Sequence, residues 1–149
     1  MHPTALRFRD RAREAGLAVD VRELSESTRT AVEAADAVGC ELGQIVKSVI
    51  LMDGDDPLLC LCAGDRRVAV GRLGDGVRMA KANEVRDVTG YAIGGVPPLG
   101  HPAPLHTVID EQLGRFETVW AAAGTPHAVF PVSFEELVRI TDASVTRVS

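Results

Sequence analysis

The sequence predicts an α+β fold built around a curved, mixed β-sheet. Helix-like and strand-like segments follow one another without the regular strand–helix–strand rhythm of a parallel sheet. The apolar segments 45–52 and 58–63 are separated by a short polar turn, which is typical of a β-hairpin. The 149 residues are 46% hydrophobic, enough for one core, so we expect a single domain spanning residues 1–149.

Capping signals indicate where the helices begin. Thr30 and Glu33 form a capping box, in which each side chain satisfies a backbone N–H at the start of the helix. A second capping box begins at Ser133, and Asn83 is expected to cap another helix. The predicted helices cover residues 4–15, 30–39, 83–90 and 133–141.

Strands are expected where apolar and β-branched residues alternate or run together between turn signals. Residues 66–73 are ambiguous, because the Val-Ala-Val run favours a strand whereas Asp65 as a cap and Gly74 as a stop favour a short helix; we favour the helix. The predicted strands are residues 19–24, 45–52, 58–63, 77–81, 107–110, 118–122 and 128–132.

The net charge of −5 limits the partners that we expect. Affinity for long nucleic acids comes largely from phosphate neutralisation, so we expect neither DNA binding nor the coating of long RNA. Binding the end of a single strand remains compatible with this charge. Arginines gather at positions 7–13 and 66–72, either as solvated faces or as a weak phosphate-binding patch.

The sequence carries no signal for a membrane or for secretion. No apolar run approaches the ~20 residues that span a bilayer, and the Arg-rich first residues lack the apolar core of a signal peptide. The three cysteines, Cys40, Cys60 and Cys62, are an odd number without a CxxC pair. Cys60 and Cys62 would share one face of a strand, where they cannot easily bond each other. We therefore expect reduced thiols and a cytoplasmic location.

Lys47 is the one charged residue in the apolar run 45–52. Burying an ammonium without a partner is costly, which makes this lysine a candidate functional residue. The alternative is that its aliphatic stem is buried while its charged end reaches solvent.

The segment 90–101 (GYAIGGVPPLGH) predicts a loop of fixed shape. Its glycines permit positive φ and a close approach of the backbone to a ligand, and its prolines fix φ and lack an N–H. Together with Lys47, such a loop suggests a pocket with one cation and a backbone-lined wall; the alternative is a plain connection. The residues concerned are Gly94, Gly95, Pro97, Pro98 and Gly100.

The usual side-chain machinery of catalysis is missing from the sequence. There is no GxSxG or SxxK motif and no cysteine with a credible histidine partner. The four histidines lack the spacing of zinc ligands, so we predict no metal site and no cofactor. This leaves either a non-catalytic binding protein or a reaction that needs little from side chains.

The sequence resembles the YbaK family of aminoacyl-tRNA deacylases, which is related to the editing domain inserted in bacterial prolyl-tRNA synthetases. The resemblance covers nearly the whole chain and rests on the IVKS strand with Lys47, the GYAIGGVPPLGH loop and the TVID strand at 107–110. It implies one editing domain over residues 1–149, built around a barrel-like sheet. It also implies removal of wrongly attached amino acids from tRNA, often from tRNA-Pro.

The resemblance implies roles for individual residues. Lys47 would anchor the terminal nucleotide of tRNA or its phosphate, and a backbone amide such as that of Gly95 or Gly100 would stabilise the developing oxyanion. Thr30 would line the acyl pocket, although its capping role alone explains it. His101 follows Gly100 at a position where relatives vary, so the resemblance assigns it no role; it either reaches the acyl group or is a solvated loop histidine.

The loop also departs from the family pattern. Pro97-Pro98 stands where many relatives have Ser-Pro, so the family's serine hydroxyl is absent. We count Gly94, Pro97 and Pro98 among the substrate-binding residues.

The predicted function is therefore hydrolysis, in trans, of the ester of mischarged tRNA, with a small wrong amino acid on tRNA-Pro as the expected substrate. With no evident side-chain base, the neighbouring ribose hydroxyl would position the attacking water. The expected partners are the acceptor end of aminoacyl-tRNA and prolyl-tRNA synthetase. The alternative is a non-catalytic module that binds a nucleotide or the acceptor end and regulates a synthetase.

Overall fold

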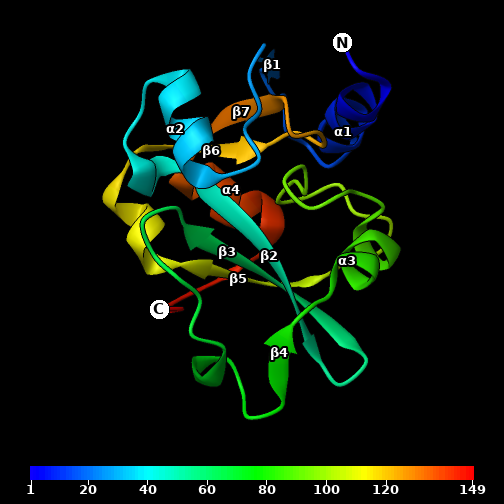
Figure 1. Cartoon of the computed structure of the whole chain (residues 1–149), viewed down its shortest axis with the longest axis vertical. Coiled ribbons are helices and arrows are strands. Elements are labelled where there is room, and N and C mark those ends of the chain that lie inside the picture. Colours follow the sequence, from blue (N-terminus) through cyan, green and yellow to red (C-terminus); the bar gives the residue numbers. More distant parts are fainter.

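The computed structural model describes residues 1–149 and contains four α-helices and eight strands (Figure 1). The helices are α1 (Pro3–Glu14), α2 (Ala31–Val38), α3 (Ala82–Thr89) and α4 (Phe134–Thr141). The strands are β1 (Arg22–Glu23), β2 (Val46–Asp53), β3 (Asp56–Ala63), β4 (Val77–Met79), β5 (His106–Asp110), β6 (Thr118–Ala122), β7 (Ala128–Ser133) and β8 (Ser144–Thr146).

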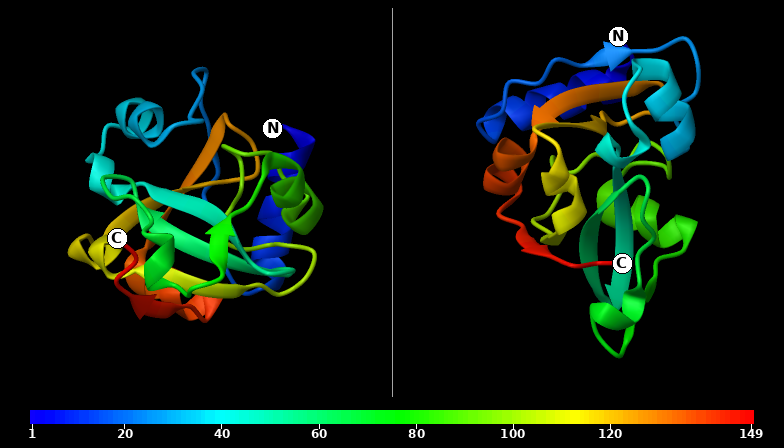
Figure 2. Two further views of the ribbon diagram at one scale, coloured as in Figure 1. Left: turned by 60° about the horizontal axis from the view of Figure 1, so that its bottom comes forward. Right: turned by 90° about the vertical axis from the view of Figure 1, so that its left-hand side faces the viewer.

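The strands form two sheets rather than one. The five-stranded sheet has the order β4-β2-β3-β5-β8, with an antiparallel β2–β3 hairpin and parallel β3–β5 and β5–β8 pairs; the three-stranded sheet has the order β1-β7-β6. A single bridge between Ile45 and Trp120 joins the two, and Figure 2 shows the smaller sheet beside α1 and α2. The predicted α+β class is confirmed. The barrel-like shape is not, because the strands divide between two sheets that do not close.

The main core lies between the two sheets. Phe8 of α1 and Phe130 of β7 are fully buried, with ring centroids 5.1 Å apart. Leu61 and Ile109 of the larger sheet and Leu137 of α4 are buried in the same cluster. Each such side chain contributes ~1.5–3 kcal/mol on burial, so this core fixes how the sheets pack.

The opposite face of the larger sheet carries a second, smaller cluster. Leu51, Cys60, Cys62 and Val108 are buried there, and Val68, Val70 and Leu73 pack against the cluster. Strands β2 and β3 are therefore covered on both faces, which is why their sequences read as continuous apolar runs. All three cysteines are unpaired.

One predicted helix cap is wrong, and one predicted helix is shorter than expected. The helix α3 is capped at Lys81, not at Asn83, because Glu84 accepts a hydrogen bond from the Lys81 amide at 2.9 Å and pairs with Arg78 at 2.8 Å. In the segment 66–73 only Val70–Arg72 forms a 3₁₀ turn. The β-branched residues there disfavour a longer helix, and the Ala69 amide is taken by the carbonyl of Val148.

Two strand predictions also differ from the structure. Residues 19–24 pair with β7 only at Arg22 and Glu23. The strand β8 was not predicted, because three partly exposed residues carry no periodic pattern. Its register is set instead by parallel pairing with β5.

Candidate functional site

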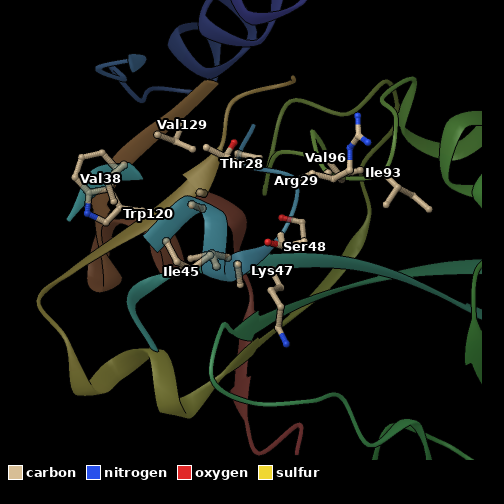
Figure 3. Close-up of a pocket in the computed structure, with 17 residues that line it drawn as sticks. Thr28, Arg29, Val38, Ile45, Lys47, Ser48, Ile93, Val96, Trp120 and Val129 are labelled. Atoms are coloured by element: carbon tan, nitrogen blue, oxygen red, sulfur yellow. The ribbon is translucent and has the colours of Figure 1, made fainter. Parts of the chain in front are cut away.

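A cavity of about 370 Å³ opens where the two sheets meet, between β2, β6, the start of α2 and the loop before Pro97 (Figure 3). Eleven of its 17 lining residues are hydrophobic, so its wall is mostly apolar. Three residues singled out by the sequence border it: Thr30, Lys47 and Gly94. We call this space the first cavity.

The segment that leads into α2 forms one rim of the first cavity. Thr28 donates from its amide and its hydroxyl to the Pro126 carbonyl, at 2.6 and 2.9 Å. Thr30 caps α2, its hydroxyl accepting from the Glu33 amide at 3.1 Å. Arg29 therefore lies between two fixed residues, both of which also line the cavity.

Lys47 and Ser48 are neighbours on β2 and face opposite sides of the sheet (Figure 3). Ser48 borders the first cavity, and its buried hydroxyl has no hydrogen-bond partner. Lys47 lies opposite Cys62 in the β2–β3 pair, and its ammonium donates to the carbonyl of Arg66. Sequence reasoning missed Ser48; the alternation next to Lys47 was the available signal.

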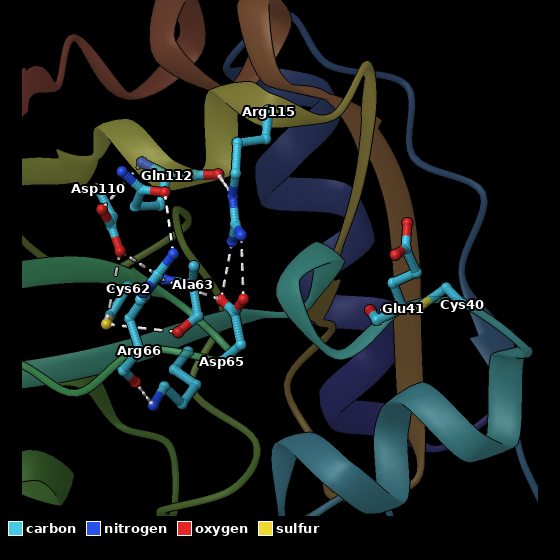
Figure 4. Close-up of polar contacts among 10 residues, drawn as sticks. Cys40, Glu41, Cys62, Ala63, Asp65, Arg66, Asp110, Gln112 and Arg115 are labelled. Carbon is cyan, nitrogen blue, oxygen red and sulfur yellow. Dashed lines mark hydrogen bonds and ion pairs between the residues drawn. The ribbon is translucent and has the colours of Figure 1, made fainter.

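A polar cluster fixes the loop that supplies the Arg66 carbonyl (Figure 4). Asp110 is fully buried and accepts from the amides of Ala63 and Gln112 at 3.1 and 3.0 Å. Asp65 pairs with Arg115 at 2.8 Å, and hydrogen bonding from that guanidinium lowers the pKa of Asp65. Lys47 is thus held against a firmly anchored turn.

The cysteines near this cluster are not nucleophiles. Burial raises the pKa of Cys60 to about 12 and that of Cys62 to about 11. Because the thiolate is the reactive form, both thiols are inert at neutral pH. No group of three or more His, Cys, Asp and Glu side chains is placed to hold a metal ion.

The loop lies close against its surroundings at both central glycines. Gly94 has φ +93°, and a Cβ there would lie 2.8 Å from Cγ of Arg29. A Cβ on Gly95 would lie 2.9 Å from the backbone of Gly124 and Thr125. The Gly95 amide donates to the Ala92 carbonyl at 3.0 Å, whereas the amides of Gly94 and Val96 donate to no protein group.

The far end of the loop lines a different space. Pro98, Gly100 and His101 border a second cavity of about 630 Å³, formed with the ends of α1 and α4. Arg11 donates to the Gly100 carbonyl at 3.0 Å. Gly95 and Pro97 border neither cavity. Of the eight predicted site residues, the structure therefore places three at the first cavity, three at the second and two at neither.

His101 lies beside the second cavity with both ring nitrogens buried and without a hydrogen bond. Its ring meets Tyr91 edge to face, with centroids 6.1 Å apart. Burial lowers the pKa of His101 to about 4, and the charge of Arg11 adds to this shift. The imidazole is therefore neutral at physiological pH.

No helix of the chain is both long and apolar enough to cross a membrane. Comparison with known proteins adds to this geometry. Residues 25–140 match the aminoacyl-tRNA editing domain. The chain is 33% identical over 131 residues to the uncharacterised protein YwhH of Bacillus subtilis, covering 85% of this chain and 83% of YwhH.

Two further relatives have more informative names. Over 131 residues the chain is 21% identical to an Enterococcus faecalis protein, EbsC, provisionally named a Cys-tRNA(Pro)/Cys-tRNA(Cys) deacylase, covering 84% of this chain and 80% of EbsC. A crystal structure provisionally assigned to a trans-editing enzyme for prolyl-tRNA synthetase has a TM-score of 0.94 and 43% identity. That match covers 100% of this chain and 98% of the other.

Proposed function

Since the chain belongs to the aminoacyl-tRNA editing domain family, we propose that it hydrolyses the ester that joins a wrong amino acid to tRNA, acting in trans. The observation that carries the proposal is the first cavity, which brings Thr30, Lys47 and Gly94 to one space. The named activities of the relatives support the same reaction class. The acceptor end of aminoacyl-tRNA is the partner that this reaction requires.

The first cavity is the proposed site for the amino acid. Its volume of about 370 Å³ lies at the small end of the ~300–1,000 Å³ range of ligand pockets. Its apolar wall suits an uncharged side chain, and α2 contributes Ala31, Ala34 and Val38 to it. Thr30 stands beside them at the helix start. These features support a small or medium-sized amino acid as the group removed.

The loop amides are the proposed oxyanion donors. A preorganised N–H directed at the ester carbonyl oxygen stabilises the charge that develops there. Gly94 and Val96 border the cavity and have unused N–H groups. Gly95 shapes the turn between them, since its own amide is bonded to Ala92. Pro97 fixes the backbone that follows and has no N–H to compete.

Lys47 is the proposed anchor of the terminal nucleotide. Its stem borders the first cavity while its ammonium rests on the Arg66 carbonyl. A lysine is a point charge on a flexible four-carbon stem, so it reaches the cavity mouth by rotation within the side chain. Substrate binding would exchange the carbonyl of Arg66 for an oxygen of the nucleotide.

The remaining loop residues act in this proposal through the shape of the loop. Pro98, Gly100 and His101 hold its far end against α1 and the second cavity. This contribution to substrate binding is indirect, because it fixes where Gly94 and Val96 lie.

The reaction needs a nucleophile but no strong side-chain base. A water oxygen attacks the ester carbonyl carbon, and the bond from that carbon to the ribose oxygen then breaks. The ribose oxygen takes up a proton, and the amino acid leaves as a free acid. The vicinal ribose hydroxyl lies within hydrogen-bond reach of the attacking water, so the substrate supplies its orientation.

A panel of mischarged tRNAs incubated with the pure protein tests this proposal. We expect release of at least one amino acid at a rate proportional to the protein concentration, with tRNA-Pro charged with a small amino acid as the first substrate to try. The competing function is a non-catalytic module that binds the acceptor end and regulates a synthetase. Tight binding without turnover on any tRNA would favour that alternative.

A further inference from the structure

The rim of the first cavity carries a guanidinium that contacts no other polar group. Arg29 is exposed and lines the cavity, and its side chain forms neither an ion pair nor a hydrogen bond. Other arginines of the chain are held by carboxylates: Arg22, Arg66, Arg78, Arg115 and Arg139. Arg29 is therefore available to an outside anion.

The backbone and stem of Arg29 are nevertheless fixed. On either side of it, Thr28 is hydrogen-bonded to the Pro126 carbonyl and Thr30 to the Glu33 amide. The Arg29 amide itself donates to the hydroxyl of Ser27 at 3.2 Å. Gly94 packs so closely that a Cβ would meet Cγ of Arg29 at 2.8 Å and its Cα at 3.4 Å. The absence of a side chain at Gly94 lets the loop and the arginine stem form one rim. A fixed stem lowers the entropy lost when the guanidinium binds.

The other cation at this cavity is already engaged. The ammonium of Lys47 is bonded to the Arg66 carbonyl and lies on the opposite face of β2 from Ser48. The protein as a whole is acidic, with a net charge of −5, so a local cation at the mouth is needed to hold a phosphate there. Guanidinium also matches phosphate geometry better than ammonium, because it donates two parallel hydrogen bonds.

We propose that Arg29 binds the phosphate that links the last two nucleotides of the tRNA acceptor end. This inference rests on the proposed function, in which the amino acid occupies the first cavity. The ester then lies at the cavity mouth, and that phosphate is one nucleotide away, at the rim. Lys47 holds the terminal nucleotide, and Arg29 holds the phosphate that precedes it.

The test is a binding cycle with a stem–loop RNA that ends in single-stranded CCA. A second RNA carries an uncharged methylphosphonate at the last linkage. We expect the methylphosphonate and Arg29→Ala each to weaken binding about tenfold, and the two together to weaken it no further. Arg29→Ala should also reduce the slope of log affinity against log salt by ~0.7, the share of one phosphate on a single strand.

Two variants control the cycle. Arg86→Ala removes an exposed arginine that borders neither cavity and lies outside both arginine groups, so it should leave both affinities unchanged. Arg29→Lys keeps the charge and should recover part of the affinity. If Arg29→Ala and the methylphosphonate weaken binding additively, the inference is overturned. It is also overturned if the methylphosphonate has no further effect on the affinity of Lys47→Ala but retains its full effect on that of Arg29→Ala. Deacylation of mischarged tRNA is measured in parallel; its absence in the wild-type protein would refute the proposed reaction while the binding cycle still decides the role of Arg29.

Discussion

The two ends of the glycine–proline loop have opposite surroundings. Near Gly94 the loop borders the first cavity, and the amides of Gly94 and Val96 have no acceptor. Near Gly100 the carbonyl accepts from both Arg11 and Tyr91, at 3.0 and 3.4 Å, and the second cavity lies beside it. The first end thus presents free amides to the first cavity, whereas the second has its Gly100 carbonyl bonded to α1 and to Tyr91. We infer that chemistry takes place at the first end and anchoring at the second.

The largest expected effect comes from the substrate. A mischarged tRNA whose terminal adenosine lacks the vicinal ribose hydroxyl should bind normally and turn over ~10²–10⁴-fold more slowly, the range typical of general-base catalysis. Single-turnover rates measure this. His101→Ala, at the anchored end, should cost less. The opposite outcome would be an inactive His101→Ala protein together with unchanged cleavage of the deoxy substrate by the wild type. It would place the chemistry at the end of the loop near Gly100.

The second-largest effect is expected from Lys47→Ala. This variant should turn over ~10²-fold or more slowly, a loss comparable to the removal of one stabilising group at the transition state. The loss of its bond to the Arg66 carbonyl should cost only ~1 kcal/mol of unfolding free energy. Initial rates and thermal unfolding are measured together, with Lys81→Ala as the matched control because Lys81 is exposed and borders neither cavity. A folded Lys47→Ala protein with wild-type rates would exclude Lys47 from the site.

Gly95→Ala should lower stability by ~1–3 kcal/mol, because the new Cβ would lie 2.9 Å from the backbone of Gly124 and Thr125. Gly71→Ala is the matched control, since nothing lies within 4 Å of a Cβ there. Chemical denaturation measures both variants. Gly95 belongs to the packing of the loop if turnover per folded molecule is retained, and to the site itself if turnover falls at unchanged stability.

The stability of the protein should fall in mild acid because of His101. Its folded pKa of about 4 lies below the ordinary 6.5, so the unfolded chain binds the proton more readily. The contribution of neutral His101 to the free energy of unfolding is complete above pH 6.5. Roughly 3 kcal/mol of this free energy is lost progressively as the pH falls towards 4. His101→Leu should flatten this part of the stability profile, whereas the exposed control His106→Gln should not. A His101→Leu profile that still follows the wild type would place the titrating group elsewhere.

Metal removal should have the smallest effect. We expect turnover to survive exhaustive treatment with EDTA, because no cluster of His, Cys, Asp and Glu side chains is placed to hold an ion. Rates before and after chelation, and after added zinc or magnesium, measure this. Activity lost on chelation and restored by either metal would contradict the proposed mechanism.

The sequence alone determined most of the elements and the family. The β2–β3 hairpin was predictable because both strands are buried on two faces and leave long apolar runs. The start of α2 was predictable because the bonds between Thr30 and Glu33 join residues three apart. The GYAIGGVPPLGH loop was recognisable because glycine and proline act on the backbone of their own segment. Such features are local in the chain.

Tertiary structure decided everything that depends on contacts distant in sequence. The sequence predicts one curved sheet. The structure has two, because pairings between distant segments, such as β1 with β7, decide which strands share a sheet. The sequence predicts that the whole loop forms the wall of one pocket. In the structure Arg11 of α1 donates a hydrogen bond to the Gly100 carbonyl, and Gly100 does not border the cavity that Gly94 lines. No sequence signal singles out Arg29; its place at the cavity rim follows from its packing against Gly94. Local sequence carries backbone preference and burial, whereas the partner of each charged group is set only when distant segments meet.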